Sequence, residues 1–401
     1  MTEQAKVPAI RFAGFTDPWE QRKLSEVATF GGGHTPPMAD PDNYEDGYVL
    51  WVTSQDVKSN YLDRTTTQIT EKGAKELTLY PAGSLVMVTR SGILRHTLPV
   101  AELRKPSTVN QDIRVILPQG ECCGEWLLQF FISHNKELLL EFGKTGTTVE
   151  SVDFGKIKDM LLYMPSTVEQ QQIGDFFAKL DSLITLHQRK YDKLVIFKKS
   201  MLEKMFPKDG ESVPEIRFAG FTDPWEQRKL EDIANRVTRK NEGESDLPLT
   251  ISSQYGLVDQ RTFFNNQVAS KDMSGYYLLR KGEFAYNKST SGDSPWGAVK
   301  RLVRYEKGCV STLYICFGLD GADPDFLVTY YETDRWYKAV QMIAAEGARN
   351  HGLLNIAPND FFDTALILPP SREEQEPIGL FFARLDNLIT LHQRKRLWFA
   401  K

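Results

Sequence analysis

One block, PAIRFAGFTDPWEQRKLSEVA at residues 8–28, returns as PEIRFAGFTDPWEQRKLEDIA at residues 214–234, with seventeen of twenty-one positions identical. A second block repeats at nearly the same offset: IGDFFAKLDSLITLHQRK at 173–190 and IGLFFARLDNLITLHQRK at 378–395 match at fifteen of eighteen positions. The sequences between the blocks differ from each other. A repeat of about 200 residues is too long for a solenoid unit, so each half is predicted to be a domain followed by a connector.

The composition is that of an ordinary globular protein. With 401 residues, 41% of them hydrophobic and 25% charged, the chain is long enough for two cores. No run reaches eighteen apolar residues and the N-terminus lacks an apolar signal segment, so we expect a cytoplasmic protein with no membrane contact. The four cysteines form no CxxC pair and lie near no histidine at ligand spacing, which predicts reduced core thiols and no metal site.

The second block is predicted to open a long helix from about Thr167 to Phe206. Its apolar residues recur at steps of four and three, interrupted by His187 and Lys198: Ile173, Phe177, Leu180, Ile184, Tyr191, Leu194, Met201 and Met205. The natural partner is the equivalent helix that starts near Ser371. Antiparallel pairing would make a coiled-coil-like rod with approximate two-fold symmetry and one domain at each end. After Lys395 the second copy reads RLWFAK where the first continues YDKLVIFKKSMLEKMF, so we expect a lopsided rod.

These patterns divide the chain into four parts: a first domain at 1–166, a central helix at 167–207, a second domain at 208–370 and a shortened C-terminal helix at 371–401. The inserts, about 29–166 and 235–369, have one predicted element order, and their mixture of strands and helices indicates an α/β (α+β) fold. A glycine opens one strand in each, GSLVMVTRSG at 83–92 and GEFAYNKSTSG at 282–292. A further strand follows (DIRVILP or CVSTLYICFGL), then a helix at 124–142 or 323–345, a polar loop and a last apolar strand.

Two polar loops fall at matching places in the inserts, one after the glycine-led strand and one after the helix. Arg and Lys can bond guanine edges, Asn reads adenine, and Ser or Thr contacts base or phosphate, although such loops are also common as solvated turns. The candidate DNA-binding residues are Thr89, Arg90, Ser91, Arg95, His96, Lys144, Thr147 and Thr148 in the first insert, and Asn287, Lys288, Ser289, Thr290, Arg349, Asn350 and His351 in the second.

Charge gives a mixed indication about nucleic acid. The net charge of −4 argues against a freestanding non-specific DNA binder, because phosphate neutralisation supplies much of the affinity for DNA. Local excesses of +4 at residues 271–307 and +3 at residues 86–116 can still engage phosphates. We therefore expect tight DNA binding only together with basic partners.

No catalytic motif is present. There is no Walker P-loop, Gly-x-Ser-x-Gly elbow or His-Glu-x-x-His, and the glycines of TFGGGHTPP do not have dinucleotide-binding spacing and predict a turn. The six histidines are scattered, and no carboxylate pair is singled out by spacing. The sequence therefore predicts no catalytic residue, no metal ligand and no bound cofactor in this chain.

The complete order, in which each half carries the first block, an insert and the second block, resembles the specificity (S) subunits of type I restriction–modification systems, especially staphylococcal ones. The resemblance is carried by FTDPWEQRKL at the head of each half, by the Ile-Gly, Phe-Phe, Leu-Asp and His-Gln-Arg-Lys run of each helix, and by GGGHTPPMADPDNYEDGYVLWVTSQDV. It implies two target-recognition domains, each reading half of a bipartite double-stranded DNA target, and helices that fix the spacer between the halves.

The same resemblance implies the partners. Two methyltransferase (M) subunits would methylate adenines with S-adenosylmethionine, and restriction (R) subunits would translocate and cleave DNA with ATP and Mg. The S chain would be a non-catalytic specificity subunit. Two alternatives remain: a bivalent protein-interaction scaffold without DNA readout, and a complete nuclease or methylase with an unrecognised site.

Overall fold

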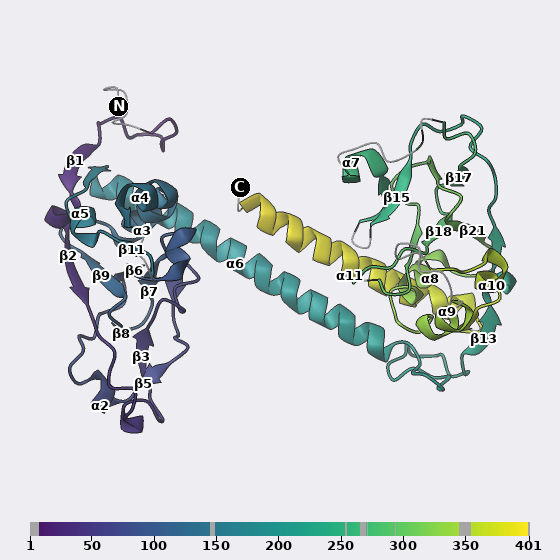
Figure 1. The fold of residues 1–401 in the computed structure, drawn as a ribbon, viewed down its shortest axis with the longest axis horizontal. Coiled ribbons are helices and arrows are strands. Elements are labelled where there is room, and N and C mark those ends of the chain that lie inside the picture. The colour runs from purple at the N-terminus through teal and green to yellow at the C-terminus, as the bar shows by residue number, and fades with distance from the viewer. Residues whose placement is uncertain are drawn as a thin grey trace. The chain divides into compact units, whose positions relative to one another are not determined.

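The computed structural model describes residues 8–144, 149–252, 255–264, 270, 272–292, 294–344 and 354–399. Residues 396–399 are described by their backbone alone. The chain divides into two compact units, Met1–Ile184 and Thr185–Lys401. Figure 1 shows mixed strands and helices in both units and the long helix α6, Thr167–Lys204, which runs from the first into the second. The mixed α/β (α+β) fold with a long helix is as predicted. In the described part of the chain, no helix is both long enough and apolar enough to cross a membrane.

Unit 1 is built on a five-stranded sheet in the order β2-β9-β6-β7-β4, in which only the β4–β7 pairing is parallel. A three-stranded sheet, β5-β3-β8, and two strand pairs, β1–β12 and β10–β11, complete it. The strands are β1 (Glu20–Lys23), β2 (Ala28–Gly32), β3 (Val49–Val52), β4 (Tyr61–Leu62), β5 (Gln68–Ile69), β6 (Leu85–Val88), β7 (Val100–Leu103), β8 (Ser107–Val109), β9 (Ile113–Pro118), β10 (Gly143–Lys144), β11 (Ser151–Val152) and β12 (Leu161–Met164). The helices are α1 (Leu24–Val27), η2 (Pro41–Asn43), α2 (Glu71–Ala74), η3 (Gly92–Arg95), α3 (Gly124–Ser133), α4 (Asn135–Phe142) and α5 (Phe154–Lys158).

The central strand β6 shows why unit 1 has layers on both faces of its sheet. All four of its residues are buried, and successive side chains of a strand point to opposite faces. Leu85 and Met87 join the core that includes α3 and α4, whereas Val86 and Val88 join the core that includes β3. The strand starts after Gly83, whose φ of +87° favours glycine, and its counterpart β18 starts after Gly282 at +94°. These two predicted strands are confirmed.

Unit 2 repeats the same central order, because β14-β21-β18-β19 corresponds to β2-β9-β6-β7. Its strands are β13 (Glu226–Lys229), β14 (Ala234–Arg236), β15 (Leu249–Ser252), β16 (Gly256–Asp259), β17 (Tyr277–Arg280), β18 (Phe284–Asn287), β19 (Ala298–Arg301), β20 (Lys307–Val310), β21 (Ile315–Leu319) and β22 (Ala365–Leu368). Its helices are η4 (Leu230–Asp232), α7 (Gln260–Phe264), α8 (Pro324–Tyr330), α9 (Tyr337–Ile343), α10 (Pro358–Phe362) and α11 (Arg372–Phe399). The two inserts therefore share one scaffold.

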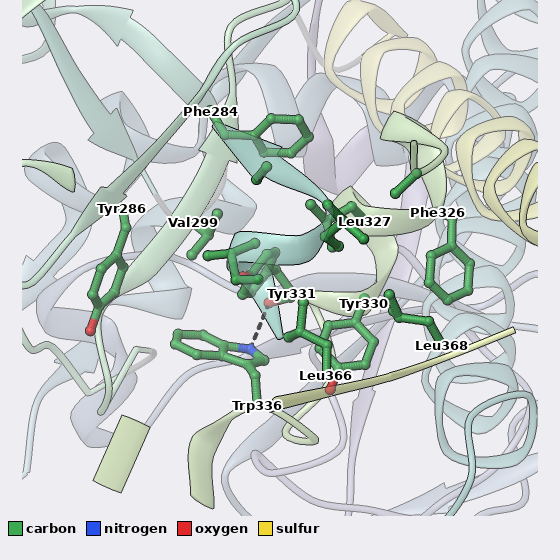
Figure 2. Close-up of a cluster of buried hydrophobic side chains, with 14 of the residues drawn as sticks. Phe284, Tyr286, Val299, Phe326, Leu327, Tyr330, Tyr331, Trp336, Leu366 and Leu368 are labelled. Atoms are coloured by element: carbon green, nitrogen blue, oxygen red, sulfur yellow. Dashed lines mark hydrogen bonds between the residues drawn. The ribbon is translucent and has the colours of Figure 1, made fainter. Parts of the chain in front are cut away.

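The core of unit 2 is rich in aromatic side chains (Figure 2). Tyr286 of β18 stacks on Phe361 of α10 with ring centroids 4.5 Å apart, which fixes this helix on the sheet. The Trp336 Nε1–H donates to the Tyr331 carbonyl oxygen at 3.2 Å, so the buried indole has its polar group paired. This network anchors the segment between α8 and α9.

The repeated blocks form one structural frame, which occurs once in each unit. Strand β1 pairs antiparallel with β12, and β13 pairs with β22 in the same way. Arg11 donates from Nε and Nη2 to the two carboxylate oxygens of Glu169, at 2.6 and 2.7 Å, and Arg217 binds Glu374 with the same geometry. Both glutamates are buried at the start of a long helix. Each insert is thus held between a strand and a helix that the sequence repeats.

Within unit 2, the second half of α6 packs antiparallel along α11. Phe197 meets Phe381 with ring centroids 6.3 Å apart. The two predicted interruptions of the apolar series make specific contacts: His187 Nδ1 lies 2.8 Å from His392 Nδ1, and Lys198 Nζ donates to Asp386 Oδ1 at 2.5 Å. Since those pairs hold polar groups against each other, they fix the register of the two helices.

Several predicted elements are broken in the structure. The helix at 124–142 divides at His134, whose backbone (φ −98°, ψ 13°) leaves the α region and whose ring nitrogen Nδ1 lies 3.0 Å from the Phe130 carbonyl oxygen. The helix predicted at 323–345 is divided into two helices: α8 ends at Tyr330, and α9 begins at Tyr337, after Trp336. The strand predicted from CVSTLYICFGL divides into β20 and β21 around a turn closed by Tyr314 N–H and the Ser311 carbonyl.

The predicted glycine turn at 31–33 is also wrong. Gly31 and Gly32 belong to β2, and a Cβ on Gly31 would overlap the Tyr80 ring. The Tyr80 hydroxyl donates to the Gly32 carbonyl at 2.7 Å and accepts from the Gly32 amide at 2.8 Å. The glycines therefore make room for a buried tyrosine against the strand.

Candidate nucleic-acid interface

In unit 1 the two predicted loops lie together. We call residues 89–96 and 143–151 the first loop pair. The backbone of Arg90 forms an isolated antiparallel β-bridge with that of Ser151, and the Ser91 amide donates to the Glu150 carbonyl at 3.1 Å. The Arg95 Nε donates to a Glu150 carboxylate oxygen at 2.5 Å, across 55 positions of sequence. Described residues from two segments that are distant in the sequence therefore lie together at one edge.

The predicted residues of this edge differ in what they expose. Thr89 is buried and its hydroxyl donates to the Asp112 carbonyl at 3.0 Å, so it supports the loop from inside. Arg90, Arg95 and His96 are exposed, and the half-buried Ser91 caps η3 by accepting from the Ile93 amide. These exposed side chains can reach a ligand from a firmly bonded backbone.

Two ion pairs involve the second segment of the first loop pair. Lys144 lies 2.8 Å from the Asp153 carboxylate, and this hydrogen bond lowers the pKa of Asp153. In the same way, the Arg95 guanidinium lowers the pKa of Glu150. Both carboxylates therefore stay ionised and orient cations at the edge. Thr147 and Thr148, the other two candidates in this loop, lie outside the described residues.

In unit 2 the equivalent loops also meet. We call residues 287–290 and 345–356 the second loop pair, of which 345–353 lie outside the described residues together with the candidates Arg349, Asn350 and His351. The Leu354 amide donates to the Lys288 carbonyl at 3.0 Å, and Lys288 Nζ donates to the Ile356 carbonyl at 3.2 Å. Partial burial lowers the pKa of Lys288.

The remaining candidates of unit 2 follow Lys288 on the same loop. The Asn287 side chain accepts from the Ser289 amide at 3.1 Å, which shapes the turn. Ser289 and Thr290 are exposed. Among the described residues, each unit thus joins its first loop to the end of its second loop, with different side chains.

The sequence did not predict a pocket that lies between β2, β9 and α5. It has a volume of about 400 Å³ and is lined by Phe30, Gly31, Arg114, Phe154, Gly155 and Lys158. Lys158 Nζ lies 4.9 Å from the Phe30 ring centroid and 5.5 Å from that of Phe154, both within cation–π range. The basic stretch at 86–116 included Arg114, but nothing in the spacing indicated that α5 would bring Lys158 beside it.

The described residues contain no group of three or more His, Cys, Asp or Glu side chains placed to hold a metal ion. One buried acidic group stands out in unit 1, where Glu102 lies beside Glu125 and both contact Arg104. Burial, together with the neighbouring Glu125 carboxylate, raises the pKa of Glu102 to about 7. Arg104 also lies over the Tyr61 ring, 4.1 Å from its centroid, so this group is part of the packing of β4, β7 and α3.

Comparison with known proteins agrees with this architecture. Residues 16–195 match the family model of the type I restriction modification DNA specificity domain. The chain is 29% identical over 186 residues to the specificity subunit of the type I restriction enzyme EcoR124I/EcoR124II from Escherichia coli, covering 43% of this chain and 46% of that protein. It is also 29% identical over 171 residues to the MjaIX specificity subunit from Methanocaldococcus jannaschii, covering 41% and 38%.

These matches span less than half the length of the curated relatives. A solved structure covers far more of the chain: the S subunit of a type I restriction–modification system from M. genitalium has a TM-score of 0.55 over 98% of this chain and 95% of its own, at 11% identity. That likeness concerns the fold.

Proposed function

We propose that the chain is a specificity subunit of a type I restriction–modification system and selects its DNA target, each unit reading one half of a bipartite sequence. The match of residues 16–195 to the specificity-domain model and the similarity to curated specificity subunits support this proposal. The observation that carries this proposal is the repeated pair of loops. Both units have the same central strand order and the same repeated frame, but the side chains of their loops differ. The two units are therefore suited to bind two different short sequences.

The side chains at these edges have the chemistry of base readout. Exposed arginines such as Arg90 can donate two hydrogen bonds to guanine in the major groove, whereas Ser289 and Thr290 can donate to or accept from several bases. Arg114 and Lys158 line the pocket between β2, β9 and α5 and would contact phosphate, which positions a protein without reading sequence. Recognition by unit 1 would therefore combine a specific and a non-specific part.

The long helices are proposed to set the spacer between the half-sites. At 1.5 Å per residue, the 38 residues of α6 span roughly 57 Å. His187 and Lys198 fix its register on α11. A helix held in one register is a suitable element for keeping a fixed separation.

The catalytic partners are proposed to bind the repeated frame. Four leucines occupy equivalent positions in the two copies and expose similar fractions of their surface: Leu183 38%, Leu186 45%, Leu388 46% and Leu391 45%. Identical exposed apolar positions in two copies suit two identical partners. We propose that two M subunits dock there and bring S-adenosylmethionine, that R subunits bring ATP and Mg, and that the chain itself is non-catalytic.

Exchange of one insert tests the proposal. Residues 29–166 are replaced by the insert of a related specificity subunit, and the chain is expressed with its M subunits in a host whose methylated adenines are mapped by sequencing. We expect one half of the methylated motif to change while the other half and the spacer stay the same. A protein-interaction scaffold would give no DNA footprint with its partners, and a change in both half-sites would contradict separate reading.

A further inference from the structure

We infer that Gln111 is a further specificity-determining residue of unit 1, and that it reads an adenine in the half-site bound by this unit. This role rests on the proposed function and adds a third segment to the reading edge, the turn at residues 110–113. Gln111 lies outside both loops of the first loop pair, and the sequence did not single it out.

The turn at 110–113 leads from β8 into β9 and has a fixed backbone. The Ile113 amide donates to the Asn110 carbonyl at 3.4 Å, and the Asp112 amide donates to the Asn110 side-chain oxygen at 3.1 Å. Asn110 is buried, whereas Gln111, the second residue of the turn, is exposed. The turn therefore presents the Gln111 side chain to solvent from a firmly bonded backbone.

This turn is joined to the first loop pair. The Thr89 amide and the Thr89 hydroxyl both donate to the Asp112 carbonyl, at 2.8 and 3.0 Å. The contact is at the end of the sheet where β6 stops and β9, its antiparallel neighbour, starts. Gln111 adjoins one member of this bonded pair in the sequence, and the exposed Arg90 adjoins the other. The two side chains therefore belong to one edge of unit 1.

Another segment of the chain holds the Gln111 side chain in one orientation. The Thr35 hydroxyl donates to Gln111 Oε1 at 2.6 Å, across 76 positions of sequence. The segment that carries Thr35 comes close to the end of β8 because a glycine precedes it: a Cβ on Gly33 would overlap the Val109 carbonyl oxygen. A glutamine that is already held in place loses less side-chain entropy on binding than a free one does.

The held amide has the hydrogen-bonding groups that adenine requires. A glutamine can donate from Nε2 to adenine N7 and accept at Oε1 from the adenine amino group. An amide oxygen has two lone pairs, and Thr35 uses one of those on Gln111. In the part of the chain that the structure describes, Gln111 Nε2 has no hydrogen-bond partner. Both groups needed for a bidentate contact are therefore available.

Unit 2 has the same turn with a different exposed residue. The Tyr314 amide donates to the Ser311 carbonyl at 3.1 Å, and the Leu313 amide donates to the Ser311 hydroxyl oxygen at 3.4 Å, which is the bonding pattern of the turn in unit 1. Its second residue is Thr312, which is exposed. Gln111 and Thr312 thus occupy one place on a shared scaffold with different chemistry, as residues that contact different bases would.

The test uses the full chain with its M subunits and maps methylated adenines by sequencing. With Gln111→Ala we expect one base position of one half-site to become degenerate, its discrimination falling by roughly tenfold or more, while the other half-site and the spacer stay the same. Thr35→Val removes the hydroxyl and should relax the same position more weakly. In the double variant it should add little to Gln111→Ala, because the hydroxyl acts through the glutamine.

Gln119→Ala is the matched control. Gln119 is also exposed, and its Nε2 donates to the Thr29 hydroxyl oxygen at 3.0 Å, but it follows the opposite end of β9. This variant should keep the methylated motif of the unaltered chain. Thermal unfolding of both glutamine variants should be nearly unchanged, because each alters an exposed side chain.

The role of Gln111 is overturned if Gln111→Ala keeps the original motif, or if it lowers methylation alike at every base position, as loss of a phosphate contact or of loop structure would. Failure of the proposed function looks different, because the unaltered chain itself would then direct no methylation to a bipartite site, and both proposals would fall.

Discussion

Glu374, at the start of α11, binds Arg217 and Trp225 of the repeated block at 214–234. We expect Glu374→Ala to destabilise unit 2 by about 3–5 kcal/mol, the usual cost of removing one partner of a buried ion pair. Its carboxylate is 2% exposed. It accepts from Arg217 at 2.6 and 2.7 Å and from the Trp225 indole N–H at 3.1 Å. The bound carboxylate raises the pKa of Arg217, so the guanidinium would stay charged and lose its partner.

The first copy of the frame supplies the control. Glu169→Ala breaks the equivalent bidentate pair with Arg11, whose side chain is 14% exposed against 10% for Arg217. Trp19 Nε1 is buried but has no hydrogen-bond partner in the described part of the chain, whereas its counterpart Trp225 bonds Glu374. Glu169→Ala should therefore cost less in unit 1 than Glu374→Ala costs in unit 2, by about 1 kcal/mol for the missing hydrogen bond.

Hydrogen exchange followed by mass spectrometry measures the loss of stability in each unit separately. A single unfolding temperature does not assign the loss to one unit when the chain has two units that can unfold independently. For a unit of roughly 200 residues, a loss of this size lowers the unfolding temperature by about 10 °C. The protection of β22 should fall in Glu374→Ala and that of β12 in Glu169→Ala. A loss below about 1 kcal/mol in unit 2, or a larger loss in unit 1 than in unit 2, would refute the reasoning.

Three further predictions concern recognition and pH. Arg90→Ala and Lys288→Ala should each impair methylation at one half-site without disturbing assembly, because they lie in different loop pairs; methylome sequencing checks this, and loss at both half-sites in either variant would contradict it. Arg114→Ala and Lys158→Ala should weaken DNA binding by the assembled complex uniformly across sequences and each lower the salt slope by about 1, as titrations at several salt concentrations would show. Burial raises the pKa of Glu102 to about 7, so its carboxyl binds a proton more readily in the folded chain than at its ordinary value of 4.5. Unit 1 should therefore lose stability as pH rises from about 4.5 to 7, and Glu102→Gln should remove that part of the decline in urea unfolding.

The repeated frame was predictable because its sequence occurs twice in the chain and because its long helices follow from a local apolar pattern. The α6 helix was expected from Thr167 to Phe206 and is observed at Thr167–Lys204. The glycine-led strands were also readable, since a positive φ at Gly83 and Gly282 is a local requirement. Breaks within the predicted helices were not readable, because the contacts of His134 and Trp336 that accompany them depend on tertiary packing.

The candidate site was predictable only in part. Local chemistry singled out both members of each loop pair, but their contact depends on strand pairing between distant segments, such as Arg90 with Ser151. The same limit explains why the sequence does not indicate that the candidate Thr89 is buried in the fold. Lys158 was missed for the opposite reason, because a lysine on a short helix has no distinguishing local pattern.

The repeated aspartate of the two helices shows how one frame can hold unlike domains. Asp181 accepts hydrogen bonds from Asn60 at 2.9 Å and Gln129 at 3.3 Å, both supplied by the first insert. Its counterpart Asp386 instead binds Lys198 of α6, which also lies 2.7 Å from Glu332 of the second insert. The frame residue is constant, while the partner depends on the unit.

This difference bears on the exchange of inserts. A donor insert that carries an amide or hydroxyl at the places of Asn60 and Gln129 satisfies Asp181 by itself, and the helix needs no compensating change. An insert that places a carboxylate there would set two negative charges side by side at a half-buried position. Because the contact lies between insert and helix, the first kind of exchange should change recognition alone, whereas the second should also loosen the domain on its spacer.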